Sequence, residues 1–143
     1  RHPDLQAQLR ADPALLPGAI EEFLRLYTPY RGFARTAVRD VEMGARAIPE
    51  GEAIALLYCS ANRDEDVFPQ GDQFIMNRPN IGEHLAFGRG PHNCPGLHLG
   101  RMQLRVAMEE LLSASPNGFE LAGDITMSRW PEIGPLVVPR RFL

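Results

Sequence analysis

The chain has 143 residues, a length that suits one compact domain around a single core. Its hydrophobic content of 44%, charged content of 23% and net charge of −3 are typical of a soluble globular protein. They do not favour binding to nucleic acid or to an anionic membrane surface. All 15 basic side chains are arginine, which excludes a lysine-containing phosphate-binding loop and a lysine that forms a Schiff base.

The two cysteines, Cys59 and Cys94, lie far apart in sequence and in different surroundings. We therefore expect no disulfide framework, and a reducing, cytoplasmic location. The longest apolar run covers residues 53–59 and is too short to cross a membrane. The chain begins at Arg1 without an initiator methionine, so we expect it to be part of a longer protein, which leaves open whether an anchor precedes it.

A helix is predicted near the start of the chain. Asp12 and Pro13 are favourable residues at a helix start, and apolar residues recur at helical spacing up to Tyr27. Pro17-Gly18 predicts a break within this helix, and Pro29 ends it.

The part of the chain from residue 32 to residue 59 predicts a small sheet. Residues 32–41 have the alternating, β-branched character of a strand. Residues 49–51 have turn chemistry, and the apolar run at 53–59 predicts a strand buried on both faces. Cys59, within this run, is expected to be an inert core thiol.

The second half of the chain begins with a long irregular segment. Residues 60–90 lack periodicity and are rich in Asn, Asp, Pro and Gly, and irregular segments of this length are usually functional. A helix is then predicted to run to about Leu112, because one stripe contains Leu97, Leu104, Met108 and Leu111. The tail is expected to form turns and short strands, of which 136–138 is the clearest.

Residues 87–96, Phe-Gly-Arg-Gly-Pro-His-Asn-Cys-Pro-Gly, place Cys94 on a glycine-rich loop just before the predicted helix. The partial positive charge at a helix N-terminus favours the thiolate, which is the form that binds metals. Gly88, Gly90 and Gly96 allow the backbone to approach a large flat ligand and to adopt positive φ. Phe87 supplies an aromatic wall.

This loop resembles the haem-binding loop of cytochromes P450. In that family a phenylalanine, two spaced glycines, a basic residue two before the cysteine and a glycine two after it occur together. These positions are filled here by Phe87, Gly88, Gly90, His92 and Gly96. The resemblance implies haem b (iron protoporphyrin IX) with Cys94 as its axial thiolate ligand, and His92 as a donor to a haem propionate.

A zinc site is the alternative use of this part of the chain, with four candidate ligands: His84, His92, Cys94 and His98. It fits less well, because it leaves the glycines and Phe87 without a purpose. Dinucleotide binding is disfavoured, since Gly88-x-Gly90 is not followed by a third glycine at the required place.

The resemblance extends to a helix motif. Glu22-Phe23-Leu24-Arg25 matches the E-x-x-R signature of the family, and the i, i+3 spacing puts both charges on one helix face. In the family this pair is buried and shares a second arginine from the loop before the haem site, a place that Arg78 takes here. We expect this network to stiffen the cysteine loop from behind. Taken alone, the same pair would be an ordinary surface ion pair.

Further positions match the family residue by residue. Arg35 matches the arginine that pairs with a haem propionate, and residues 61–64 resemble a structural segment of bacterial members. The family segments that line the substrate pocket correspond here to Tyr30, Arg31, Gly32, Phe33 and the turn near Trp130.

The resemblance implies the mostly α, minor-β cytochrome P450 fold: E-x-x-R helix, small sheet, long meander, cysteine loop, proximal helix and C-terminal β-hairpin. Residues 1–143 are then the C-terminal portion of a single catalytic domain. The helix that crosses the distal haem face, with its acid and alcohol for oxygen activation, precedes this portion in the family. We therefore expect residues 1–143 alone to be inactive.

The implied reaction is monooxygenation of a small organic substrate, with O2 as cosubstrate. The electrons are expected from a ferredoxin with an NAD(P)H-dependent reductase, and the arginines that could dock an acidic carrier are Arg89, Arg101 and Arg105. Two alternatives stay open. One is a haem-thiolate peroxygenase or rearranging enzyme that needs no redox partner, and the other is an inactive truncated product.

Pro95 departs from the family pattern, in which a non-proline residue directs its N–H toward the sulfur. Proline has no N–H to donate. Pro95 either serves only to start the helix, or leaves the thiolate more electron-rich and so lowers the reduction potential of the iron.

Overall fold

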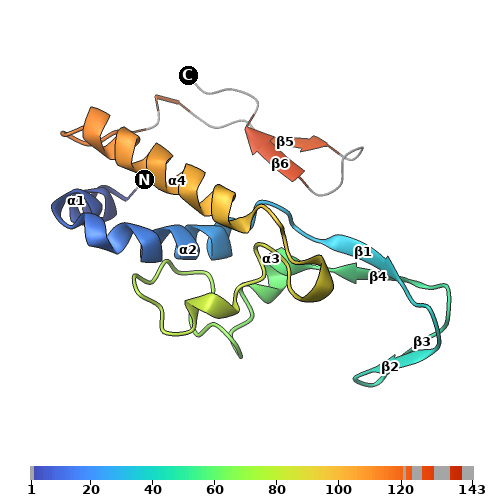
Figure 1. Ribbon diagram of the computed structural model, residues 1–143. Coiled ribbons are helices and arrows are strands. Elements are labelled where there is room, and N and C mark those ends of the chain that lie inside the picture. The colour runs from blue at the N-terminus through green and yellow to red at the C-terminus, as the bar shows by residue number, and fades with distance from the viewer. Residues whose placement is uncertain (1, 121, 124–126, 131–135, 140–143) are drawn as a thin grey trace.

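The computed structural model describes residues 2–120, 122–123, 127–130 and 136–139 (Figure 1). Its main helices are α1 (Pro3–Ala11), α2 (Leu16–Tyr27) and α4 (Leu97–Ala114). The described strands form three antiparallel pairs: β1 (Phe33–Thr36) with β4 (Ala53–Leu56), β2 (Val41–Met43) with β3 (Arg46–Ile48), and β5 (Met127–Trp130) with β6 (Leu136–Pro139).

Helix α2 contains the predicted apolar periodicity, but it begins at Leu16, after the predicted start at Asp12-Pro13. The Asp12 carboxylate accepts a hydrogen bond from the Ala14 N–H (3.1 Å) and caps the short 3-10 helix η1 (Pro13–Leu15), which leads into α2. The predicted break at Pro17-Gly18 is wrong, because Pro17 lies in the first turn, where a missing N–H costs no intrahelical bond. Helix α1 was not predicted, and its only buried residue is Leu9.

The core lies where α1, α2 and α4 meet the segment before the cysteine loop. Its buried members are Leu9, Leu16, Ala19, Ile20, Leu24, Ala86 and Leu112. Burying an aliphatic side chain contributes about 1.5–3 kcal/mol. Since α2 supplies most of this cluster, α2 is the element against which the others are positioned.

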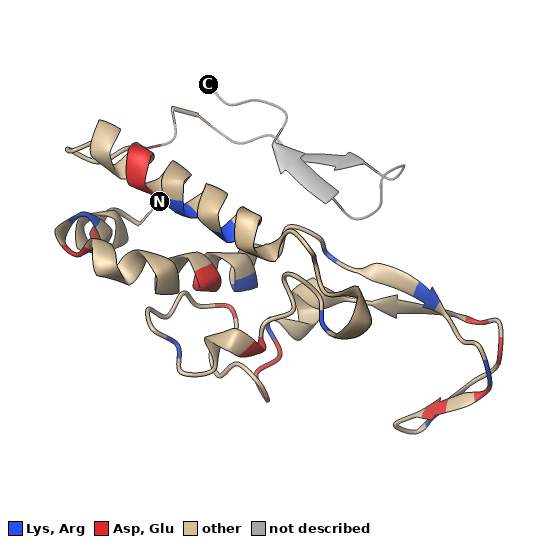
Figure 2. Cartoon of the chain, viewed as in Figure 1, with Lys and Arg blue, Asp and Glu red and all other residues tan. Residues whose placement is uncertain are grey.

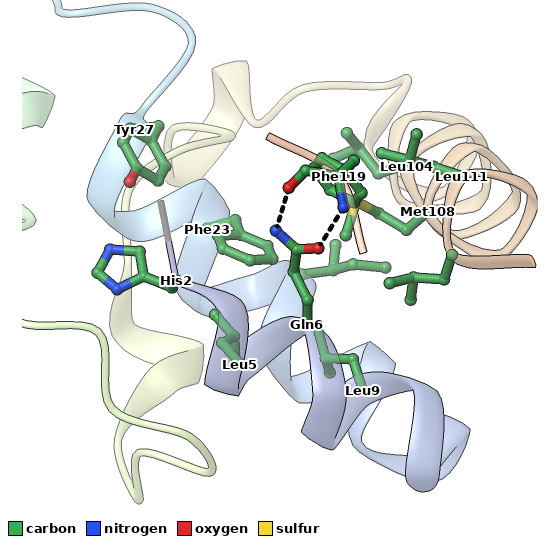
Figure 3. Close-up of a pocket in the computed structure, with 12 residues that line it drawn as sticks. His2, Leu5, Gln6, Leu9, Phe23, Tyr27, Leu104, Met108, Leu111 and Phe119 are labelled. Carbon is green, nitrogen blue, oxygen red and sulfur yellow. Dashed lines mark hydrogen bonds between the residues drawn. The ribbon is translucent and has the colours of Figure 1, made fainter. Parts of the chain in front are cut away.

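An apolar groove of about 390 Å³ lies beside the core, between α1, α2 and α4 (Figure 3). The Gln6 side chain donates to the Phe119 carbonyl (3.0 Å) and accepts from the Phe119 N–H (3.1 Å), which fastens the chain after α4 to α1. Three residues of the predicted α4 stripe line the groove: Leu104, Met108 and Leu111. These three residues therefore face α1 and α2.

The strand predicted at residues 53–59 is shorter and more exposed than expected. Strand β4 ends at Leu56 and the short helix α3 (Tyr58–Ala61) follows, so Cys59 lies in a helical turn and is partly exposed. Along β4, exposed and half-buried residues alternate, so only one face of this strand is partly covered. The predictions of a strand buried on both faces and of Cys59 as a buried core thiol are wrong. The strand predicted at 32–41 is divided between β1 and β2.

The prediction of a long irregular segment is confirmed. From residue 62 to residue 96, turns alternate with only two short 3-10 helices, η2 (Ile81–Glu83) and η3 (Gly90–His92). Such a segment has no regular ladder of backbone hydrogen bonds of its own, so its buried backbone groups need partners from other elements.

None of the described helices is both long and apolar enough to cross a membrane.

Gly32 provides a test of how closely the chain before β1 packs against β4. A Cβ atom at residue 32 would lie 2.2 Å from the Leu56 carbonyl oxygen of β4, so Gly32→Ala should force β1 and β4 apart and lower stability by about 1–3 kcal/mol. The matched control is Gly82→Ala, because a Cβ there meets nothing within 4 Å. Thermal unfolding should show a lower midpoint for the first variant only. Equal midpoints would contradict the close approach.

Candidate haem-thiolate site

Cys94 lies in the turn between η3 and α4. It is partly exposed and is not bonded to Cys59. Its N–H donates to the Phe87 carbonyl (2.9 Å), and its own carbonyl accepts from the Leu97 N–H (3.3 Å). Gly96 begins α4 without a side-chain cap, so the partial positive charge of the helix N-terminus is left beside the cysteine.

The glycines around Cys94 keep the loop open. Gly88 (φ +69°) and Gly90 (φ +80°) adopt the left-handed conformation that other residues rarely take. At Gly96 a Cβ atom would lie 3.8 Å from the Cys94 Sγ, so the absence of a side chain there leaves space next to the sulfur. A partly exposed sulfur with free space beside it, at the positive end of a helix, fits the axial ligand of a flat metal-containing cofactor.

Glu22, Arg25 and Arg78 form a buried ion network behind this loop. The Arg25 guanidinium donates from Nε and Nη2 to the two carboxylate oxygens of Glu22 (2.7 and 2.8 Å), and the Arg78 Nε donates to the same group (3.1 Å). Glu22 and Arg25 are fully buried and Arg78 nearly so. Burial raises the pKa of Glu22, but the hydrogen bonds and the charge of Arg25 outweigh it and hold that pKa below its usual value.

The remaining donors of these arginines bind the irregular segment. The Arg25 Nη1 donates to the carbonyls of Asn62 and Gly71 (both 2.6 Å), and the Arg78 Nη1 donates to the Pro69 carbonyl (2.6 Å). Every buried side-chain nitrogen and oxygen in the described part of the chain has a partner. The network therefore fixes the backbone between residues 62 and 78 from α2.

Asn62, within the family-like segment 61–64, extends this network toward the cysteine loop. It is fully buried, its side-chain amide donates to the Thr28 hydroxyl (2.8 Å), and its side-chain oxygen accepts from the Leu85 N–H (2.7 Å). Leu85 in turn accepts the Gly88 N–H through its carbonyl (2.9 Å). One asparagine thus connects the end of α2 to the residues just before Phe87.

A second network, centred on Glu21, does not follow from the sequence. Arg101 of α4 donates to both oxygens of Glu21 (2.6 and 2.8 Å), and His84 Nε2 lies 2.9 Å from the Glu21 Oε2. Although burial raises the pKa of Glu21, the hydrogen bonds from His84 and Arg101 lower it to about 2. The only sequence signal was the i, i+1 pair of glutamates on a predicted helix, which does not identify partners so far away.

His84 is nearly buried and engaged with Glu21, so it is not available for the zinc alternative. Within the described residues no three His, Cys, Asp or Glu side chains are grouped closely enough to hold a metal ion together. His98 is exposed on α4.

The predicted pocket residues lie on and beside β1. Tyr30 stacks on Phe33 (ring centroids 5.7 Å apart), and the Tyr58 ring meets Phe33 edge-on (5.9 Å). Tyr30, Arg31 and Phe33 are exposed, and Gly32 packs against β4 as described above. The Trp130 side chain lies outside the part of the chain that the structure describes.

The predicted propionate donors are both exposed. The Arg35 guanidinium lies 6.0 Å from the centre of the Phe33 ring and donates to the Ala34 carbonyl (2.8 Å), and His92 ends η3. Because both residues are exposed, their side chains are accessible to another group.

The three arginines considered for docking are already paired. Arg89 binds Glu83 (3.0 Å), Arg101 binds Glu21 and Arg105 binds Glu109 (2.7 Å). Figure 2 shows acidic and basic positions on both α2 and α4. Each of these three arginines is offset by a neighbouring carboxylate, which weakens the positive electrostatic field that the arginines present to an acidic carrier.

Comparison with known proteins identifies the family. Residues 1–115 match the family model described as Cytochrome P450. Cytochrome P450-SU2 of Streptomyces griseolus is 46% identical over 118 residues, and the alignment covers 82% of this chain and 29% of that protein. A 20-oxo-5-O-mycaminosyltylactone 23-monooxygenase of Streptomyces fradiae is 40% identical over 116 residues, covering 81% of this chain and 27% of that protein.

The solved structure of cytochrome P450 CREJ superimposes with a TM-score of 0.87 at 35% identity, over 97% of this chain and 34% of that one. The chain belongs to the cytochrome P450 family. The predicted mostly α, minor-β fold of that family is confirmed. The chain spans about a third or less of the length of the relatives it matches.

Glu22→Gln should strongly destabilise the protein that contains this segment. The substitution leaves two nearly buried guanidinium groups without their counter-charge, and removing one partner of a buried pair costs about 3–5 kcal/mol. Glu109→Gln is the matched control, because its i, i+4 pair with Arg105 is exposed and contributes little to stability. Thermal unfolding of both variants measures the difference. A similar small loss in each would contradict the importance of the buried network.

Proposed function

We propose that this chain is the C-terminal portion, residues 1–143, of a single cytochrome P450 catalytic domain, and that the Cys94 thiolate is the axial ligand of haem b. The observation that carries the proposal is the placement of Cys94: partly exposed, in a glycine-rich turn at the start of a long helix, with open space beside its Sγ. Membership of the cytochrome P450 family supports it.

The residues around Cys94 have distinct roles in this proposal. Gly88, Gly90 and Gly96 permit close approach of the porphyrin, and Phe87 packs at the base of the loop. His92 and Arg35 are exposed cationic or polar donors, suited to the haem propionates. The network of Glu22, Arg25 and Arg78 holds the preceding segment in place, so that the sulfur keeps its position.

The proposed activity is monooxygenation of a small organic substrate. When bound, a haem with a thiolate ligand would supply the activation of O2: with two electrons and two protons, one oxygen atom would enter a C–H or C=C bond and the other would leave as water. The monooxygenase relative from Streptomyces fradiae supports this reaction class. In this proposal the acid and alcohol that assist oxygen activation lie on the distal helix, outside residues 1–143, so this segment alone has no activity.

Substrate and partners follow from the same proposal. Tyr30, Arg31, Gly32 and Phe33, with Trp130, line part of the substrate pocket, and the exposed aromatic stack of Tyr30 and Phe33 supplies apolar surface for it. The electrons come from a ferredoxin with its NAD(P)H-dependent reductase, in the cytoplasm. Because Arg89, Arg101 and Arg105 are paired, recognition of the ferredoxin depends on more than these three charges.

Cys94→Ser tests the ligand assignment in the longer protein. The serine hydroxyl cannot replace the thiolate, so we expect loss of the red-shifted band that the reduced, CO-bound haem shows with thiolate ligation. Cys59→Ser is the matched control and should keep the band, because Cys59 lies in α3 and is not in the loop. A Cys94→Ser variant with an unchanged spectrum would exclude the assignment.

Pro95→Leu tests whether the missing N–H affects the iron. An N–H donor beside the sulfur would stabilise negative charge there, so we expect the reduction potential to rise by an amount on the order of tens of millivolts. Redox titration of the haem-loaded longer protein measures the shift. An unchanged or lowered potential would instead favour the simpler role of Pro95 as a residue that starts the turn into α4.

A further inference from the structure

Phe87 is mechanically linked to Cys94. The Phe87 carbonyl accepts the Cys94 N–H (2.9 Å), so a displacement of Phe87 displaces the backbone that bears the sulfur. Whatever holds the Phe87 ring in place therefore contributes to the position of Cys94.

The Phe87 ring is held by α4, the helix that follows Cys94. The Arg101 guanidinium carbon lies 4.7 Å from the centre of the ring, within the range of a cation–π interaction. A Cβ at Gly100 would lie 3.5 Å from the ring, so the helix approaches the ring closely at that residue. Arg101 thus lies between the loop that precedes Cys94 and the helix that follows it.

Glu21 fixes both Arg101 and the residues before Phe87. It binds Arg101 through two short hydrogen bonds in a bidentate arrangement. The Ala86 N–H donates to His84 Nδ1 (3.2 Å), so the proton of the neutral ring lies on Nε2, which donates to Glu21. One carboxylate on α2 therefore joins the irregular segment before Phe87 to α4, which follows Cys94.

The neighbouring glutamates of α2 serve different sides of the loop. Glu22 faces Arg25, Arg78 and the Ile75 N–H, which all belong to α2 or to the meander. Glu21 lies about 100° further round the helix and faces α4. Of these two carboxylates, only Glu21 has described contacts on both sides of Cys94.

We propose that Glu21 is a positioning residue of the cysteine loop, acting on Phe87 through Arg101 and His84. The inference rests on the proposed function, since it concerns how firmly the Cys94 thiolate is held against the haem. It assigns Arg101 to the interior of this network, in contrast to a role in docking a partner.

The test uses the haem-loaded longer protein with Glu21→Gln, Arg101→Met and the double variant. The measurement is the rate at which the reduced, CO-bound protein loses its thiolate band in mild denaturant. Each single variant should lose the band about tenfold faster, the change expected when a charge-assisted hydrogen bond is removed. The double variant should be no faster than the faster single variant, because both residues act in one unit.

Two control variants separate positioning from general stability. Glu109→Gln removes an exposed carboxylate that pairs on α4, and should retain the wild-type rate. Leu9→Ala removes a core side chain of α1, and should lower the thermal midpoint while affecting the rate of band loss less than Glu21→Gln. If band loss in the Glu21 and Arg101 variants equals that of wild type, or simply follows the thermal midpoint as in Leu9→Ala, the inference is wrong. Absence of the band in the wild-type protein would instead overturn the proposed function.

Discussion

The buried charge of Glu22 is the constraint on which the rest of this structure depends. A carboxylate with no exposed surface is tolerable only if its charge is matched and its oxygens are fully hydrogen-bonded. Arg25 and Arg78 supply that match, and their remaining donors must then find acceptors in the interior. These acceptors are backbone carbonyls of the irregular segment. The network therefore specifies the path of a segment that has almost no regular secondary structure to define it.

The cysteine loop also needs support from outside itself. Glycines with positive φ keep it open, but they contribute no side chains that could hold it. Asn62 reaches it through Leu85, and the Glu21 network reaches it through His84 and Arg101. Since all of these contacts lead back to α2 or to the turn at its end, α2 links the hydrophobic core to the site.

The sequence predicted the parts of the site that depend on local patterns. Cys94 with its glycines and the E-x-x-R spacing of Glu22 and Arg25 are visible within ten residues of chain. The Glu21 contacts could not be predicted, because they join residues 63 and 80 positions apart and involve residue types that are common on any helix surface. The prediction of a buried strand at 53–59 was wrong for a related reason. An apolar run shows a preference for burial, but only the tertiary structure decides what covers it.

A loop that presents a thiolate to a large cofactor has two opposing requirements, open space around the sulfur and a fixed position for it. Bulky residues would satisfy the second at the expense of the first. In this chain the two are separated in space: Gly96 and Gly90 leave open space, while buried and partly buried charges on α2 provide the rigidity from a distance. Charged networks suit this purpose better than apolar packing, because a bidentate guanidinium–carboxylate pair fixes orientation as well as separation. Burying such charges costs free energy, but it keeps the geometry around one sulfur atom within narrow limits.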